Sequence, residues 1–309
     1  MIDIVIPFYN DYDEKWRNVL NKYMVEENSD DRQVTGEERY RDWDCFKYWF
    51  RCVEKNCKWV NKVFLLVASK TQVPKWLKTK NPKLRIVLHE EFIPKELLPT
   101  FNTFTIEVFI NKIKDLSDNY VYCNDDFYFL NPTEKEMFFI NDIPVFTDKK
   151  QKFEKFGAWW LESSDGTFYN ILNNGMDLQY EICGDKAHWY ALDHIPVAHK
   201  KNFETEIVDK YYDRFINANK TSKFRSKEMY SSHVFICLYR DLKTHYVLSN
   251  NNSYLVTVTK DIDFEEHKDC KTVCFNDTEQ LKKEDFEEVK NKMVNFFEKR
   301  FPNKSTYEK

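Results

Sequence analysis

Residues 120–127 read Tyr-Val-Tyr-Cys-Asn-Asp-Asp-Phe. The first four residues are typical of a buried β-strand, and two neighbouring acids follow almost at once. In α/β enzymes ligands bind at the carboxyl ends of strands, where such acids would lie. Neighbouring carboxylates are hard oxygen ligands, so Asp125 and Asp126 suit Mg²⁺ or Mn²⁺ bound to a diphosphate. The alternative is a turn that uses Asn and Asp for backbone reasons alone.

Strands and helices alternate before this stretch. The continuous apolar run at 63–67 is typical of a central strand that is buried on both faces. The same reading predicts further strands at 2–7 and 85–89, and helices at 13–25, 43–56 and 104–113. This alternation predicts an α/β fold with a mainly parallel, Rossmann-like sheet and helices on both faces.

The second half of the chain has weaker patterns. We expect 134–190 to be less regular, with Trp159-Trp160 and Gly166 in loops or short strands. Beyond it the spacing predicts helices at 203–218, 227–240 and 283–300 and a strand at 254–259. We therefore expect one catalytic unit over 1–309. Its expected parts are an α/β core at 1–133, an irregular insertion at 134–190 and a helical segment at 191–309 that completes the site.

The composition excludes several classes of protein. The chain has 309 residues and a net charge of −4, so it lacks the basic excess of a nucleic-acid binder. The five glycines form neither a P-loop nor a dinucleotide-binding turn. The apolar start is too short for a secretory signal, and no run is long enough to span a membrane. We expect a cytoplasmic enzyme, at most docked to the inner face of the cell membrane.

The eight cysteines lack the spacing of a disulfide framework. Cys45 and Cys52 lie on one face of a predicted helix, so we expect free, buried thiols in a reducing compartment. Cys270 and Cys274 could hold a metal ion, but the chain offers no second pair at a suitable spacing.

Several short motifs follow one another in a specific order. They are Ile2–Val5, Arg39-Tyr40-Arg41-Asp42, Gln72–Leu77, Ile86–Glu90, Leu98–Asn102, Asn124-Asp125-Asp126, His194-Ile195-Pro196, Lys223–Ser226, Cys274–Asp277 and Phe301–Ser305. In this order they resemble the shared segments of the Stealth family of sugar-1-phosphate transferases. That family includes bacterial capsule polymerases and the enzyme that tags lysosomal hydrolases with GlcNAc-phosphate.

The resemblance implies a reaction and a glycosyltransferase-A-like fold with an additional helical C-terminal portion. A sugar-1-phosphate, of a hexose or an N-acetylhexosamine, would pass from a nucleotide sugar to a hydroxyl group of a glycan. The donor would be UDP-GlcNAc or a similar compound, the acceptor an oligosaccharide or lipid-linked glycan, and UMP or CMP would leave. The cofactor would be Mg²⁺ or Mn²⁺, and the setting would be surface or capsular polysaccharide synthesis.

The resemblance also assigns roles to residues. Asp125 and Asp126 would bind the metal ion, with Asp277 as a further ligand or a turn residue. His194 would be the general base and Arg225 would neutralise the transferring phosphate, with Asp126 as the third catalytic group. The expected donor-binding residues are Arg39, His89, Asn102 and Asn124, of which His89 could instead only order the site. Trp159 and Trp160 could stack on sugar faces, although we expect core packing.

Two other functions stay open at this point. An ordinary metal-dependent glycosyltransferase would use the same acid pair but release UDP. A carbohydrate-binding protein would retain the fold without turnover. The sugar, the base, the acceptor, the oligomeric state and the choice between polymerisation and single addition do not follow from the residues.

Overall fold

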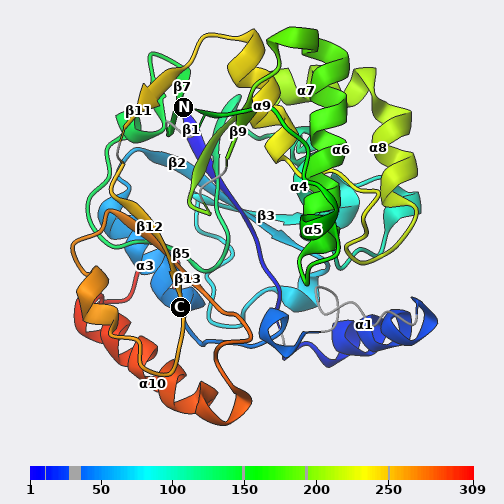
Figure 1. Cartoon of the computed structure of the whole chain (residues 1–309). Helices are drawn as coiled ribbons and strands as arrows, with labels where there is room; N and C mark the ends of the chain where they lie inside the picture. Colours follow the sequence, from blue (N-terminus) through cyan, green and yellow to red (C-terminus); the bar gives the residue numbers. More distant parts are fainter. Residues whose placement is uncertain (11, 28–35, 148–149, 192–193, 250) are drawn as a thin grey trace.

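A five-stranded sheet forms the centre of the computed structural model, which describes residues 1–10, 12–27, 36–147, 150–191, 194–249 and 251–309 (Figure 1). Its strand order is β10 (Val197–Lys200), β4 (Asn119–Tyr122), β1 (Ile2–Pro7), β2 (Val60–Val67) and β3 (Leu84–Leu88). β1 runs parallel to β2 and β4, and β2 runs parallel to β3, whereas β10 is antiparallel to β4. The predicted mainly parallel sheet is therefore confirmed.

Helices cover both faces of this sheet. Successive residues of β1 point to opposite faces, so Ile4 and Ile6 join one apolar cluster and Val5 joins the other. The first cluster includes side chains of α3 (Phe46–Asn56) and α10 (Lys283–Arg300). The second includes side chains of α4 (Thr103–Phe109), α6 (Gly166–Cys183), α7 (Lys201–Lys210), α8 (Tyr212–Asn219) and α9 (His233–Leu242).

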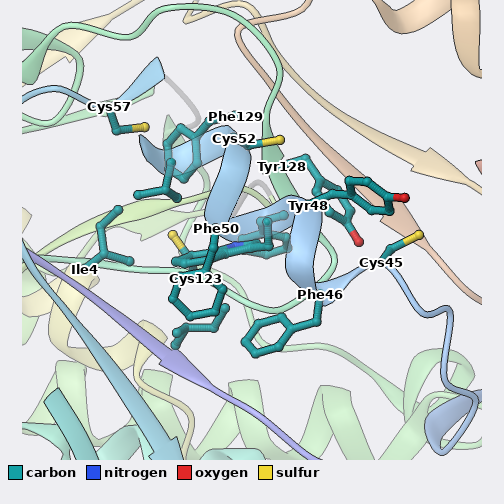
Figure 2. Packing of buried hydrophobic residues seen from close by; sticks show 14 of the residues in the cluster. Ile4, Cys45, Phe46, Tyr48, Phe50, Cys52, Cys57, Cys123, Tyr128 and Phe129 are labelled. Atoms are coloured by element: carbon teal, nitrogen blue, oxygen red, sulfur yellow. The ribbon is translucent and has the colours of Figure 1, made fainter. Parts of the chain in front are cut away.

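The helix predicted at 43–56 is α3, and its spacing explains its packing. Phe46, Trp49, Phe50 and Val53 recur at helical spacing and are all buried. Figure 2 shows Phe46 and Phe50 on one side of α3, in the same cluster as Ile4 of β1. Because burial of one such side chain contributes about 1.5–3 kcal/mol, this face fixes α3 on the sheet.

Three small sheets complete the fold of the part of the chain that the structure describes. They comprise β12 (Ser253–Thr257), β13 (Thr272–Asn276) and β5 (Phe127–Phe129); β11 (Tyr246–Leu248), β7 (Ile143–Thr147) and β6 (Phe139–Ile140); and β8 (Lys150–Gln151) with β9 (Trp189–Tyr190). β13 lies antiparallel to β5 and pairs Cys274 with Phe127. Because β5 directly follows Asp126, this pairing carries the C-terminal segment to the acid pair. The strand expected at 254–259 is β12.

The long helix α6 corrects the expectation that 134–190 is irregular (Figure 1). Its sequence contains several asparagines and glycines, which are poor helix formers. Tertiary contacts compensate: Asn174 Nδ2 donates to the carbonyl oxygens of Lys227 and Met229. A Cβ on Gly175 would lie 3.5 Å from Val234 of α9, so the two helices pack closely there.

Four further expectations about local structure need correction. The helix expected at 203–218 is two helices, α7 and α8, which are divided at Tyr211. Trp159 and Trp160 lie in the short helix α5 (Ala158–Leu161) instead of a loop or strand, and Gly166 is the first residue of α6. The helix expected at 227–240 is α9 and begins at His233. The helix expected at 104–113 is α4, which ends at Phe109 and is followed by a short 3₁₀ turn. The first predicted helix is confirmed as α1 (Glu14–Glu27).

All eight cysteines are free thiols, and seven of them are buried while Cys183 is partly exposed. This agrees with the expected use of cysteine as a small apolar residue. Among the described helices, none combines the length and the apolar character that a membrane crossing requires.

Arg51 of α3 anchors the C-terminal segment to the central sheet domain. Its side chain is only 7% exposed, and Nε and Nη2 donate to the two carboxylate oxygens of Glu308 at 2.8 and 2.9 Å. Nη1 donates to the carbonyl oxygen of Phe301 at 2.8 Å. A bidentate, buried pair of this kind joins the end of the chain to the central domain.

Replacing Glu308 with alanine should lower the free energy of unfolding by about 3–5 kcal/mol, because it leaves the Arg51 guanidinium buried without its carboxylate. Urea unfolding would measure the loss. The control is Glu26→Ala, which breaks the exposed pair with Lys22 and should cost less than about 1 kcal/mol. Equal losses in both variants would contradict the anchoring role.

Candidate active site

A cavity of about 1040 Å³ opens at the carboxyl ends of the parallel strands. Its wall includes Phe8 after β1, Ala68 after β2, His89 after β3 and Asn124 after β4. Asn276 at the end of β13 lines the same space. Parallel neighbours end at one edge of the sheet, which is why these positions converge. The volume is at the upper limit of ordinary small-molecule sites, so the cavity can hold a large ligand.

All nine predicted site residues line this cavity. They are Arg39, His89, Asn102, Asn124, Asp125, Asp126, His194, Arg225 and Asp277. Their positions come from the loop before α3, the ends of β3, β4 and β13, the start of α4, and the loops before β10 and α9. The structure therefore brings together residues that lie far apart along the chain, and their individual roles stay predictions.

The acid pair has strongly shifted acidities. The side chain of Asp125 is accessible from the cavity, and protein surrounds it on its other sides. Desolvation by this surrounding protein raises the pKa of Asp125 to about 7, and the charge of Asp126 raises it further. Burial raises the pKa of Asp126 to about 6, against a hydrogen bond from Cys274 that lowers it. Two carboxylates in such a setting favour a bound cation, because it would offset the cost of their charges.

Asp126 has one oxygen that is ready for a ligand. Its Oδ2 accepts a hydrogen bond from Cys274 Sγ at 3.2 Å, whereas the buried Oδ1 has no hydrogen-bond partner among the described residues. One ligand atom each from Asp126, His194 and Cys274 lie within 4.8 Å of one another. Cys274 therefore lies close to Asp126 and His194, whereas its spacing in the sequence suggested a pair with Cys270.

This donor set fits a divalent cation. The carboxylate oxygens of the acid pair suit Mg²⁺ or Mn²⁺, whereas a site that also used Cys274 and His194 would suit a softer metal. Asp125 and Asp277 line the same cavity but are not members of the three-residue group. The unpartnered oxygen of Asp126 is the observation that favours a cation at this corner.

Asp277 is held by an arginine that the sequence did not single out. Arg41 Nη1 lies 3.0 Å from Asp277 Oδ1 and also donates to the carbonyl oxygen of Leu281. Burial raises the pKa of Asp277 to about 6, although Arg41 opposes this shift. Asp277 Oδ2 is buried without a hydrogen-bond partner among the described residues.

His194 lies beside Asp126 of the acid pair. Its ring packs edge-on against Phe127, with centroids 4.8 Å apart and planes at 89°. The side chain is accessible from the cavity, yet burial by the surrounding protein lowers its pKa, an effect that Glu107 opposes and Arg225 increases. A lowered pKa keeps the imidazole neutral near pH 7, which is the form that accepts a proton.

Arg225 lines the same cavity in a half-buried position. Its guanidinium carbon is 4.4 Å from the centroid of the Phe104 ring. The ring face contacts the guanidinium plane, an arrangement that is compatible with pairing of a guanidinium with an anion through its edge. The charge of Arg225 acts to lower the pKa of both His194 and Tyr40, two other residues that line the cavity.

Glu107 is a cavity residue that the sequence reasoning did not assign. Its carboxylate accepts hydrogen bonds from the Ser232 hydroxyl at 2.8 Å and from the Tyr122 hydroxyl at 3.1 Å. The same Tyr122 oxygen lies 2.8 Å from Asn124 Oδ1, next to the acid pair. Glu107 is buried, and its partners Tyr122 and Ser232 lie in distant segments, so no local signal in the sequence marked this position.

The predicted donor-binding residues differ in their surroundings. Asn102 is buried and caps α4, because Oδ1 accepts from the Phe104 amide at 3.1 Å. His89 is also buried, and burial lowers its pKa to about 4, so it is neutral at pH 7. Arg39 is exposed at the cavity wall.

The raised pKa of Asp126 predicts that stability falls with rising pH when no divalent cation is present. Between about pH 4 and 6 the unfolded carboxyl loses its proton while the folded one keeps it, so the folded state loses stability over this window. Asp126→Asn should therefore be more stable than the wild type at pH 8, by about 1–2 kcal/mol, and no more stable at pH 4. Urea unfolding with a chelator across this range measures the difference. A difference that is independent of pH would contradict the shifted pKa.

Comparison with known proteins gives a consistent result. Residues 39–146 match the family described as Stealth protein CR2, conserved region 2, and residues 264–309 match Stealth protein CR4, conserved region 4. These ranges contain the acid pair and Asp277, respectively.

Relatives with curated names match over the whole chain. The chain is 33% identical to the capsular polysaccharide phosphotransferase WcwK of Streptococcus pneumoniae, across 100% of this chain and 98% of that protein. It is 27% identical to the exopolysaccharide phosphotransferase cps2G of Lactiplantibacillus plantarum, across 100% of this chain and 96% of that protein. It is 29% identical to the capsular polysaccharide phosphotransferase SacB of Neisseria meningitidis serogroup A, across 100% of this chain and 57% of that protein.

Proposed function

The chain belongs to the Stealth family and is a phosphotransferase, and from this premise we propose that it transfers a sugar-1-phosphate from a nucleotide sugar to a hydroxyl group of a glycan. The sugar would be a hexose or an N-acetylhexosamine, with UDP-GlcNAc as the first donor to try. The acceptor would be an oligosaccharide or a lipid-linked glycan of a surface polysaccharide. We place the reaction on the cytoplasmic side of the membrane, where nucleotide sugars are made.

The proposed reaction exchanges one phosphorus–oxygen bond for another. The acceptor oxygen bonds to the phosphorus nearest the sugar, and the bond from that phosphorus to the bridging oxygen of the diphosphate breaks. UMP or CMP leaves with the bridging oxygen, and the sugar phosphate becomes a phosphodiester. The proton of the acceptor hydroxyl passes to a ring nitrogen of His194.

The observation that carries the proposal is the corner formed by Asp126, His194 and Cys274, whose ligand atoms lie within 4.8 Å of one another. Here a carboxylate oxygen without a hydrogen-bond partner among the described residues stands beside a neutral imidazole. Such a corner supports the combination of a metal-bound diphosphate with a base for the attacking hydroxyl.

Each side chain has a separate task in this proposal. Asp125 and Asp126 would hold Mg²⁺ or Mn²⁺, which would neutralise charge on the diphosphate and on the leaving nucleotide. Arg225 would bind the phosphoryl group being transferred, since a guanidinium pairs bidentately with phosphate oxygens. Glu107 would orient Asn124 through Tyr122, because the Tyr122 hydroxyl contacts both a carboxylate oxygen of Glu107 and Oδ1 of Asn124. Positioning and charge neutralisation supply most of the rate in phosphoryl transfer.

Incubation with a panel of nucleotide sugars, with and without Mg²⁺, tests the proposal. The readout is the nucleotide that appears after addition of glycans from the source organism. We expect UMP or CMP, in a reaction that stops when a chelator is added. Release of UDP would instead indicate an ordinary glycosyltransferase, and donor binding without any released nucleotide would indicate a carbohydrate-binding role.

A further inference from the structure

Two tryptophans are exposed beside the cavity, contrary to the expected core packing. Trp159 is 74% exposed and Trp160 is 40% exposed, and both belong to α5. Their rings lie 4.4 Å apart at 80°, so they present two differently oriented faces. Large aromatic side chains that group together on a surface usually mark a binding site, because exposure of so much apolar area is unfavourable.

These tryptophans belong to a larger group, which we call the aromatic ledge and which comprises Phe156, Trp159, Trp160 and Tyr169. Tyr169 lies 4.9 Å from Trp160 and 4.8 Å from Phe156, and Phe156 lies 5.9 Å from Trp160, measured between ring centroids. Each of these pairs is within the range of favourable aromatic contacts. The ledge is therefore a connected surface.

The backbone of the ledge is firmly held by α6. Asn173 Oδ1 accepts from the Phe156 amide at 2.9 Å, and Asn173 Nδ2 donates to the Phe156 carbonyl oxygen at 3.0 Å. On the other side, a Cβ at Gly166 would lie 2.1 Å from the Leu161 carbonyl oxygen, so only glycine allows α5 to approach α6 this closely. A surface supported on both sides can bind a ligand without first becoming ordered.

The ledge continues into the candidate active site. Phe156 lines the cavity and lies 6.1 Å from Trp189, another residue of the cavity wall. On the neighbouring side, Phe168 stacks at 6.3 Å on Phe104, the ring that supports the Arg225 guanidinium. Aromatic side chains thus lead from the exposed tryptophans to the group that would bind the transferring phosphate.

We propose that the aromatic ledge binds the acceptor glycan through stacking of its sugar rings, with the reacting hydroxyl directed into the cavity. This inference rests on the proposed function, because it needs an acceptor that approaches the acid pair from outside. The face of a sugar ring carries C–H groups that pack on an aromatic plane, whereas its edge carries hydroxyl groups that stay solvated. A row of separate rings suits a ligand made of repeating units.

Charge favours a glycan over an anionic membrane as the occupant. Acidic residues outnumber basic ones between residues 150 and 186. Two of the lysines near the ledge are already in ion pairs: Lys155 with Asp177 at 2.5 Å and Lys152 with Glu154 at 3.0 Å. Binding to anionic lipid headgroups needs a basic excess, which this segment lacks.

The test compares Trp159→Ala and Trp160→Ala with Trp159→Phe and the wild type. The probe is a set of short oligosaccharides released from the surface polysaccharide of the source organism. We expect each alanine variant to raise the KM for these acceptors, and their dissociation constant in titration calorimetry, by about three- to tenfold. The KM for the donor and the acceptor-independent hydrolysis of the donor should not change, and Trp159→Phe should retain most of the affinity.

The matched control is Tyr212→Ala, which removes an aromatic side chain that is 40% exposed, as Trp160 is, but lies outside the cavity wall. Acceptor binding that is unchanged in both tryptophan variants, or absent in the wild type, would overturn the inference. The inference would also be overturned if the tryptophan variants lost binding to phosphatidylglycerol vesicles but kept the same acceptor KM, because the ledge would then be a membrane-binding surface. Calorimetry measures acceptor binding without turnover. If the wild type released no mononucleotide and the tryptophan variants still bound the acceptor more weakly than the wild type, the ledge would be supported and the proposed function rejected.

Discussion

Replacing Asp126 with asparagine should reduce turnover by at least about 10³-fold, the largest effect that we expect from one substitution. Asp126 contributes the buried oxygen that has no hydrogen-bond partner among the described residues. An amide keeps the size of the side chain but loses its charge, so it binds a divalent cation poorly. A loss of about 4 kcal/mol of charge stabilisation in the transition state corresponds to this factor.

The same variant separates catalysis from folding. Because Asp126→Asn should be at least as stable as the wild type at pH 8, lost activity could not be attributed to unfolding. Calorimetry with the donor should also show that Mg²⁺ no longer increases donor affinity. The control is Asp209→Asn, which changes an exposed carboxylate paired with Lys112. Normal turnover in Asp126→Asn would remove Asp126 from the metal site.

Replacing His194 with alanine should slow transfer by about 10²–10⁴-fold while leaving donor affinity within about twofold. The imidazole stands beside Asp126 and Phe127, where it can accept the proton of an incoming hydroxyl. Its lowered pKa predicts that the wild-type rate falls on the acid side only below the ordinary range of histidine. That acid limb should be absent from the residual activity of the variant.

Rate and affinity are measured separately for this variant. Single-turnover release of the mononucleotide reports the transfer step, and calorimetry with the donor reports binding. The control is His245→Ala, which removes a histidine outside the cavity wall. If His194→Ala weakened donor binding and left the transfer rate unchanged, His194 would belong to the donor-binding residues and another group would be the base.

The local patterns of the sequence were sufficient for the four parallel strands of the central sheet, but not for its antiparallel edge strand β10. The apolar run at Val63–Val67 predicts a strand that is buried on both faces, and the β-prone segment before Asp125 predicts a second strand. Parallel strands then place their carboxyl ends at one edge, and so the position of the acid pair follows from topology. The order of the short motifs indicated membership of the Stealth family, and the comparisons with known proteins support this membership independently.

The middle of the chain shows why some elements could not be predicted. α6 contains residues that disfavour a helix, and its asparagines are satisfied by contacts with distant backbone groups, such as Asn174 with Lys227 and Met229. Arg51 shows that the burial of a charged side chain could not be predicted from local patterns either. Its burial depends on Glu308, which is 257 positions away.

The sequence by itself determined the parallel strands of the central sheet, the core-facing helix α3, the acid pair at a strand end and the family, because these depend on patterns of residues along the chain. Tertiary structure decided that Cys274 meets Asp126 across 148 positions, that Glu107 is buried behind Asn124, and that Trp159 faces solvent beside the cavity. The physical reason is that burial and partner choice depend on which distant segments share a surface, and periodicity along the chain carries no information about that choice.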